Sequence, residues 1–219
     1  MQQEMMNYLM GLDLGLFHLT NAVWTNPLLD TLMPGLSQIG NRGAVWLVPL
    51  GGIATFGGKP GRRIALAGLI ALAIGFVSSA VIKEITMRPR PFAVLPDVRV
   101  LVGAPHSYAL PSGHTTSAFG AASGVLLAAK RLLGRVPVWG WGMLALAAAI
   151  AYSRLYVGVH WPTDVAAGIV HGMASGRAGV HLTLRRWRRS DLGRPEPAAT
   201  PMAATDGVEE VEYGEVIQR

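Results

Sequence analysis

The chain alternates long apolar runs with short polar or charged segments. Residues 64–82 form a 19-residue run without charge, and with its flanks at 62–87 it can form a helix that crosses a bilayer core of about 30 Å. Three further apolar runs follow at 113–129, 136–153 and 162–184, the last interrupted by two histidines and one arginine. The pattern predicts four membrane-crossing helices in this part of the chain.

The N-terminal quarter is less regular. Residues 43–58 are free of charge but short, while leucines near helical spacing in residues 5–22 predict an amphipathic interfacial helix or a first span. We therefore expect an all-α fold, a polytopic membrane helical bundle of five or six helices with a four-helix catalytic core.

Charge divides the chain further. Residues 190–219 hold two arginines against seven acidic residues, together with many prolines and alanines, and predict a disordered acidic tail. The expected organisation is residues 1–61 for the N-terminal interfacial and first membrane helices, 62–189 for the catalytic membrane domain, and 190–219 for the tail.

Composition agrees with a membrane protein, because 51% of the residues are hydrophobic and only 15% are charged. The absence of cysteine excludes thiolate nucleophiles, disulfides and cysteine-ligated zinc. The net charge of +6 could indicate a protein that binds nucleic acid. The apolar runs between the charges favour contact with a membrane surface instead. Residues 1–10 carry no basic cluster and do not resemble a cleaved signal peptide.

The connecting segments predict an orientation. Cations concentrate in residues 57–63, 130–135 and 185–189, which lie on one side if the four helices alternate in direction. The positive-inside rule assigns that side to the cytoplasm. The other side then holds residues 88–110 and the short turn around Val159.

Polar residues from four sequence-distant places gather at that outer face. They are Lys83, Arg90, Ser112, His114, Ser153, Arg154, His160 and Asp164. A charge at the centre of a membrane helix costs about 2.5–3.5 kcal/mol on insertion scales, so a cluster needs a compensating role. Three cations repel one another unless an anion lies between them, and arginine offers paired donors to phosphate oxygens.

Two helix starts add to this site. The segment 111–114 would direct free backbone N–H groups and the positive end of the helix dipole at a ligand, with Gly113 allowing close approach and Ser112 adding a hydroxyl. At the second start, Asp164 lies one helical turn beyond His160 and can hold its Nδ1–H, which leaves Nε2 free as a nucleophile. His114 could protonate the leaving group of a phosphoryl transfer.

The spacing of these residues carries a resemblance. Lys83-x6-Arg90-Pro91, then Pro111-Ser112-Gly113-His114, then Ser153-Arg154-x5-His160-x3-Asp164 resembles the type 2 phosphatidic acid phosphatase family, also called lipid phosphate phosphatases. The resemblance covers about residues 60–185 and is to the membrane-integral bacterial members.

This resemblance implies metal-independent hydrolysis through a phosphohistidine intermediate, without a cofactor. By position, His160 corresponds to the nucleophile, Asp164 to its orienting partner and His114 to the general acid. The positions that match the phosphate-binding residues of the family are Lys83, Arg90, Ser112, Gly113 and Arg154.

We therefore expect an integral lipid phosphatase of the bacterial inner membrane, with its active site on the outer or periplasmic face and a cytoplasmic C-terminal tail. The favoured substrate is undecaprenyl diphosphate, and phosphatidylglycerophosphate or phosphatidic acid are alternatives. The expected partner is a membrane lipid phosphate, with no nucleic acid and no required metal.

Other readings stay open. A vanadate-dependent haloperoxidase would share the three motifs but not the spans, and a lipid-binding or transport protein would use the pocket as a headgroup receptor. Arg88, Arg99 and His106 fall in the outer loop, where they contact a headgroup or are simply solvated. The remaining histidines have no metal-ligand spacing and are expected to be structural.

Overall fold

A computed structural model describes residues 2–192, and within this range the side chains of residues 10–41 and 43–185. From residue 193 onward the predicted acidic tail lies outside the described residues. All regular elements of residues 2–192 are helices, so the expected all-α class is confirmed.

The N-terminal third consists of short helices. They are α1 (Gln2–His18), a π-helical turn η1 (Leu19–Val23), α2 (Pro27–Ile39), a 3-10 segment η2 (Asn41–Trp46) and α3 (Leu47–Phe56). The rest of the described chain is built from four longer helices and one single turn. They are α4 (Gly58–Thr86), the single turn α5 (Pro91–Val94), α6 (Gly113–Leu133), α7 (Val138–Tyr156) and α8 (Pro162–Leu192).

The four predicted long helices form the core of the bundle. Helix α6 lies at its centre and packs against α4, α7 and α8, while α4 also packs against α8. Small residues allow these helices to approach closely. A Cβ added at Gly172 would lie 2.7 Å from the Thr116 carbonyl oxygen, and one at Gly179 would lie 2.5 Å from that of Ala67. The expected four-helix core is confirmed, with backbones in near contact.

Length and hydropathy mark only part of this core as membrane-crossing. Within the described residues, the stretches Gly58–Val94 and Val138–Tyr156 are long and apolar enough to span a bilayer. Helix α6 is as long as a span but less apolar, because it buries Thr115, Thr116 and Ser117 inside the bundle. These three polar residues face protein, and the role of α6 as a span stays a prediction.

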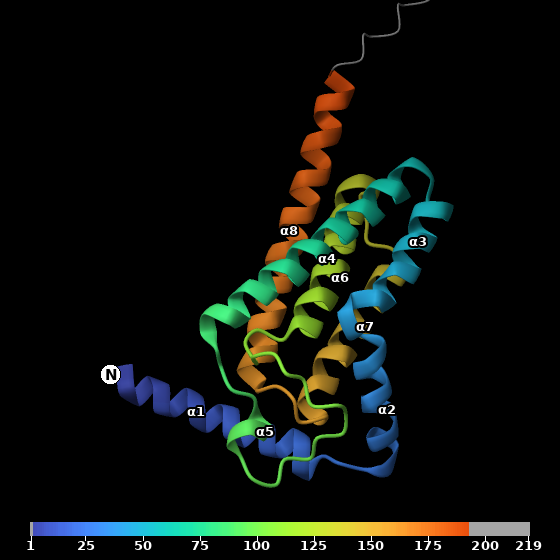
Figure 1. The fold of residues 1–219 in the computed structure, drawn as a ribbon. Helices are drawn as coiled ribbons and strands as arrows, with labels where there is room; N and C mark the ends of the chain where they lie inside the picture. The colour runs from blue at the N-terminus through green and yellow to red at the C-terminus, as the bar shows by residue number, and fades with distance from the viewer. Residues whose placement is uncertain (1, 193–219) are drawn as a thin grey trace, which may run out of the picture.

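The N-terminal helices reach the core by an interrupted path. Helix α1 lies across one end of the bundle, and α2, η2 and α3 run in series from that end to the other (Figure 1). The interruption follows Gly40, where an added Cβ would lie 2.9 Å from the Ile150 side chain and 3.3 Å from His114. This close approach brings the end of α2 against α6 and α7, beside the predicted site.

The two ends of the bundle differ in the way the charge pattern predicts. The α3–α4 turn, the α6–α7 turn and the end of α8 lie at one end, and these are the basic segments (Figure 1). Helix α1, α5, the loop of residues 95–112 and the α7–α8 turn lie at the other end. The motif residues therefore share the end opposite the basic segments.

Candidate active site

A cavity of about 520 Å³ opens at the α1 end of the bundle. Six of the eight predicted site residues line it, namely Lys83, Arg90, Gly113, His114, Arg154 and His160. The other lining residues are Ser37, Gln38, Asn41, Val102, Gly103, Pro105 and Ser107. Side chains of α2, η2, α4, α6, α7 and three loops thus converge on one space, whose described lining contains no aspartate or glutamate.

Three buried cations surround this cavity. Lys83, Arg90 and Arg154 are each less than 10% exposed. Lys83 Nζ donates to the carbonyl oxygens of Tyr108 and Ala109, and Arg154 Nη1 donates to Ser37 Oγ. Their partners are neutral, so the positive charge of the site is uncompensated by the lining, which suits an anion.

Arg154 keeps one donor unused. Its Nε is buried and has no hydrogen-bond partner among the described residues. A buried donor without a partner costs about 1–3 kcal/mol, and a bound acceptor would relieve that cost. The cavity is therefore short of acceptors as well as negative charge.

Arg90 links the loops to His160. The proline at the start of α5 leaves Arg90 extended (φ −80°, ψ 158°), and its guanidinium donates to the carbonyl oxygens of Ser107 (2.6 Å) and Val159 (2.7 Å). Arg90 Nη1 also lies 3.2 Å from His160 Nε2. Because a guanidinium only donates, this geometry makes Nε2 the acceptor and places the imidazole proton on Nδ1.

That Nδ1 faces Asp164. The distance from His160 Nδ1 to Asp164 Oδ2 is 3.4 Å, and both side chains are almost fully buried. The same carboxylate oxygen accepts the Trp161 N–H at 2.9 Å, because Asp164 lies in the first turn of α8 and bends back to its start. Asp164 is therefore behind the imidazole, and the lone pair of Nε2 is on the side of the cavity.

The surroundings keep His160 neutral. Burial lowers the pKa of its imidazole well below the usual histidine value, and the nearby cations Arg90, Arg154 and Lys83 lower it further. A neutral imidazole with a free Nε2 is the form that can act as a nucleophile.

The start of α6 lies against this histidine. Gly113 lines the cavity, and the nearest neighbours of an added Cβ would be Ser79 Oγ at 3.6 Å and Lys83 Cε at 3.9 Å. Ser112 lies behind the wall, where its Oγ accepts a hydrogen bond from Thr115 and its N–H donates to the Asp164 carbonyl oxygen at 3.0 Å. Its predicted phosphate contact stays a prediction, while its backbone ties α6 to α8.

The loop arginines are partly exposed, form ion pairs and do not line this cavity. Arg88 donates to Asp164 Oδ1 at 2.6 Å and to Asp13 of α1, and Arg99 donates to Asp30 of α2 at 2.7 Å. The Asp13 contact was missed from the sequence, although a single acidic residue between Leu12 and Leu14 is a local signal for a buried partner.

The contributions of α2 and η2 were also missed. Ser37, Gln38 and Asn41 carry no motif, and they line the cavity from the end of α2 and the start of η2. Within the part of the chain that the structure describes, no three His, Asp or Glu side chains are grouped closely enough to hold a metal ion.

A family of known proteins resembles this chain over the part that includes the eight predicted site residues. The family model of the PAP2 superfamily matches residues 64–188. The undecaprenyl-diphosphatase of Sulfolobus acidocaldarius is 35% identical over 145 residues, which are 66% of this chain and 66% of that protein. The decaprenylphosphoryl-5-phosphoribose phosphatase of Mycolicibacterium smegmatis is 35% identical over 158 residues, 72% of this chain and 81% of that protein.

One further relative matches over less of its length. The bacitracin transport permease protein BcrC of Bacillus licheniformis is 32% identical over 52% of this chain and 53% of that protein. The chain thus spans about half of this relative and just under two thirds of the Sulfolobus protein.

Two solved structures share the fold. Aquifex aeolicus LpxE has a TM-score of 0.64 and 28% identity, covering 78% of this chain and 95% of that one. A transmembrane PAP2-type phosphatidylglycerolphosphate phosphatase from Bacillus subtilis has a TM-score of 0.61 and 22% identity, covering 82% and 88%. With these neighbours the expected helical-bundle fold is confirmed. Because the family model covers more than half of the chain and the resemblance seen in the three motifs is thereby confirmed, this protein belongs to the PAP2 superfamily.

Proposed function

We propose that this protein is an integral membrane phosphatase that hydrolyses an isoprenoid diphosphate of the undecaprenyl diphosphate class. The observation that carries this proposal is the cavity itself, in which three buried cations surround His160 and no described carboxylate lines the wall. Such a site binds a polyanion, and the neutral imidazole beside it provides a nucleophile.

The chemistry follows from the placement of each group. His160 Nε2 attacks phosphorus in line, so that an N–P bond forms and the bond to the leaving oxygen breaks, with His114 giving that oxygen a proton. A phosphate oxygen replaces His160 as the acceptor of the Arg90 N–H, which frees the Nε2 lone pair. Water then attacks the phosphohistidine, His114 takes its proton, and inorganic phosphate leaves.

Each cation has a part in this step. Lys83, Arg90 and Arg154 stabilise the negative charge on the equatorial oxygens, and the Gly113 N–H at the start of α6 adds a neutral donor. Asp164 holds Nδ1–H and stabilises the positive charge that develops on the imidazole. No step requires a metal ion or a cofactor.

The preference for an isoprenoid substrate is supported by the relatives. The Sulfolobus and Mycolicibacterium proteins are named for polyprenyl substrates, and they align with 66% and 72% of this chain. Phosphatidylglycerophosphate and phosphatidic acid present the same phosphate on a different tail. The headgroup cavity alone does not separate these lipids.

We also propose the bacterial inner membrane as the location, with the site facing outward. The basic turns lie at the end of the bundle opposite the cavity, and cations of short connections stay in the cytoplasm. Cysteine labelling is suited to test this, because the chain has no cysteine. A membrane-impermeant maleimide added to intact cells should label His106→Cys and leave Arg131→Cys unlabelled, and the reverse pattern would overturn the orientation.

The activity is tested on purified full-length protein in detergent with EDTA present. Phosphate release is compared for undecaprenyl diphosphate, phosphatidylglycerophosphate and phosphatidic acid at equal micellar mole fraction. We expect release from all three, with the highest kcat/KM for undecaprenyl diphosphate. Absence of phosphate release from all three lipids would contradict the proposed phosphatase activity. A higher kcat/KM for phosphatidylglycerophosphate or phosphatidic acid would contradict the proposed substrate.

A further inference from the structure

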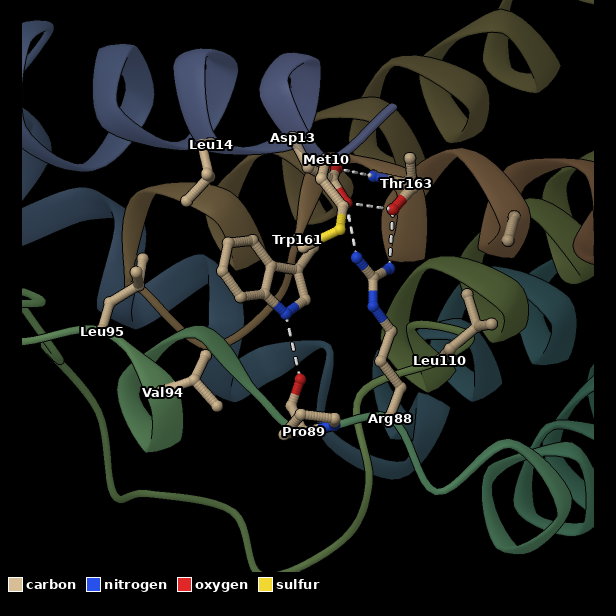
Figure 2. Close-up of a pocket in the computed structure, with 11 residues that line it drawn as sticks. Met10, Asp13, Leu14, Arg88, Pro89, Val94, Leu95, Leu110, Trp161 and Thr163 are labelled. Carbon is tan, nitrogen blue, oxygen red and sulfur yellow. Dashed lines mark hydrogen bonds and ion pairs between the residues drawn. The ribbon is translucent and has the colours of Figure 1, made fainter. Parts of the chain in front are cut away.

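A second polar network lies behind His160, on the side away from the cavity. Its centre is Arg88, whose Nη1 donates to Asp164 Oδ1 and to Thr163 Oγ1, each at 2.6 Å, and whose Nη2 donates to Asp13 Oδ2. Figure 2 shows Arg88 between Asp13 of α1 and the start of α8, beside the Trp161 ring. The guanidinium is thus directed at the back of the His160–Asp164 pair.

The two oxygens of Asp164 have different partners. Oδ2 is bonded to the Trp161 N–H and faces His160 Nδ1, whereas Oδ1 is bonded to Arg88. A carboxylate held at both oxygens cannot rotate freely about its last torsion, which is otherwise broad. Arg88 therefore fixes the plane in which Asp164 meets the imidazole.

Asp13 connects this arrangement to the N-terminal helix. It is 4% exposed, and it accepts the Thr163 N–H at 2.8 Å and the Thr163 hydroxyl at 2.6 Å as well as Arg88. The Thr163 N–H is one of the free donors in the first turn of α8. Asp13 thus joins α1, Arg88 and the start of α8, although it lies outside the part of the chain that the family model matches.

The network lies in apolar surroundings. Arg88 and Asp13 line a cavity of about 740 Å³. Figure 2 shows Leu14, Leu95 and Leu110 among its other lining residues. The Arg88 guanidinium carbon also lies 5.6 Å from the centre of the Trp161 ring. The two carboxylates are buried, with the Asp13 side chain 5% and the Asp164 side chain 0% exposed, so these ion pairs are screened less than pairs between fully exposed side chains.

Arg88 has no access to the phosphate site, because it does not line the cavity that holds Lys83, Arg90 and Arg154. We propose that Arg88 and Asp13 are positioning residues, which act on the reaction through Asp164 and make helix α1 part of the catalytic apparatus. This inference rests on the proposed phosphatase activity. It assigns to α1 a role in turnover besides any contact of its exposed apolar residues with lipid.

A purely structural tie between α1 and the bundle would predict a different outcome. The chain offers a matched control, because Arg99 and Asp30 form a similar Arg–Asp pair at 2.7 Å that joins the same outer loop to α2. That pair touches neither Asp164 nor His160 in any described contact. Arg88→Met and Arg99→Met therefore each remove one positive charge from the same loop, and only Arg88→Met removes a hydrogen bond to the His160–Asp164 pair.

The test measures kcat and KM of the full-length variants with farnesyl diphosphate as the probe. Loss of a charged hydrogen bond to Asp164 should lower kcat of Arg88→Met about 10- to 100-fold while KM changes by less than about twofold. Arg88→Lys should recover part of that loss, and Asp13→Asn should lower kcat about threefold to tenfold. Asp13→Asn should have a smaller effect in the Arg88→Met background, because the two residues act through one network.

Two results would overturn the proposal: an equal loss of kcat in Arg99→Met, or a rise in KM at constant kcat in Arg88→Met. A second readout does not depend on turnover. In protein labelled with ¹⁵N-histidine, the His160 signal, assigned by its absence in His160→Gln, should show the Nδ1–H tautomer in the wild type and a mixture in Arg88→Met. An unchanged signal would contradict the positioning role even if no lipid phosphate were hydrolysed.

Discussion

The two sides of His160 use the same residue type for opposite purposes. On the cavity side, Arg90 is bonded to carbonyl oxygens and to the imidazole, so its positive charge remains available to an anion. On the other side, Arg88 is bonded to two carboxylates, so its charge is compensated within the protein. Only one residue separates them in the chain. The comparison teaches that the partners of a buried arginine decide whether it binds substrate or positions another side chain.

The largest expected effect concerns the histidine between the two sides. His160→Ala removes the proposed nucleophile and should lower kcat for undecaprenyl diphosphate by at least about 10⁴-fold, as for other enzymes that lose a nucleophile. The measurement is phosphate release in detergent. His171→Ala is the control, since His171 contacts Ser78 between α4 and α8, and it should keep near wild-type activity. Substantial activity of His160→Ala would contradict the assignment of His160 as the nucleophile, and with it the comparison of its two sides.

The next effect is on the cavity side. Arg90→Met removes donors that face the transferred phosphoryl group and should lower kcat/KM about 10²- to 10³-fold. In contrast to Arg88→Met, a rise in KM should accompany the fall in kcat, because Arg90 also holds the ground-state phosphate. Steady-state kinetics of the two variants side by side provides the check. Identical patterns in both variants would mean that the two sides are not functionally distinct.

A third prediction uses pH. The reactive form of His160 is the neutral one, and burial together with the cavity cations lowers its pKa well below the usual value of about 6.5. The nucleophile is therefore available at neutral pH and is lost only when the pH falls through the lowered pKa. The kcat/KM profile should keep its acid limb well below pH 6.5, and Arg90→Met should move that limb upward. An acid limb near 6.5 in the wild type would contradict this environment.

The smallest expected effect is at the control pair. Arg99 and Asp30 are each about one-third exposed, and such pairs contribute little to stability. Arg99→Met should change kcat by less than about twofold, measured under the same conditions as Arg88→Met. A large loss of activity would show that the outer loop as a whole, and not the network behind His160, controls turnover.

Local patterns in the chain were sufficient to predict the long helices. The apolar runs at 62–87 and 136–153 became α4 (Gly58–Thr86) and α7 (Val138–Tyr156), because burial and hydrogen bonding along one helix depend on residues close in sequence. The interruption after Gly40 was not predicted, and the close approach of Gly40 to His114 and Ile150, more than 70 residues away, was not predictable from local patterns. Helix α8 also continues past residue 184 to Leu192, through the basic run.

The candidate site, too, was predicted in part from local spacing and in part only seen in the folded structure. Motif spacing placed His160 one turn from Asp164, and helix alternation gathered Lys83, Arg90 and Arg154 at one end of the bundle. In the structure these three cations and His160 line one cavity, and their roles there stay a prediction. Spacing does not determine which way a side chain points from a loop, so the different directions of Arg88 and Arg90 came only from the folded chain.

Periodicity and motif spacing were thus sufficient to predict the helical class, the family and the end of the bundle at which the charges gather. Each of these can be recognised from residue patterns along the chain. Packing decided that Ser112 lies outside the cavity lining and that Ser37 and Asn41 are part of it. Packing also decided that Asp13 of α1 is joined to Asp164 through Arg88. These contacts join segments distant in sequence. The geometry of these contacts depends on how closely whole helices pack together, and a local sequence pattern does not determine that packing.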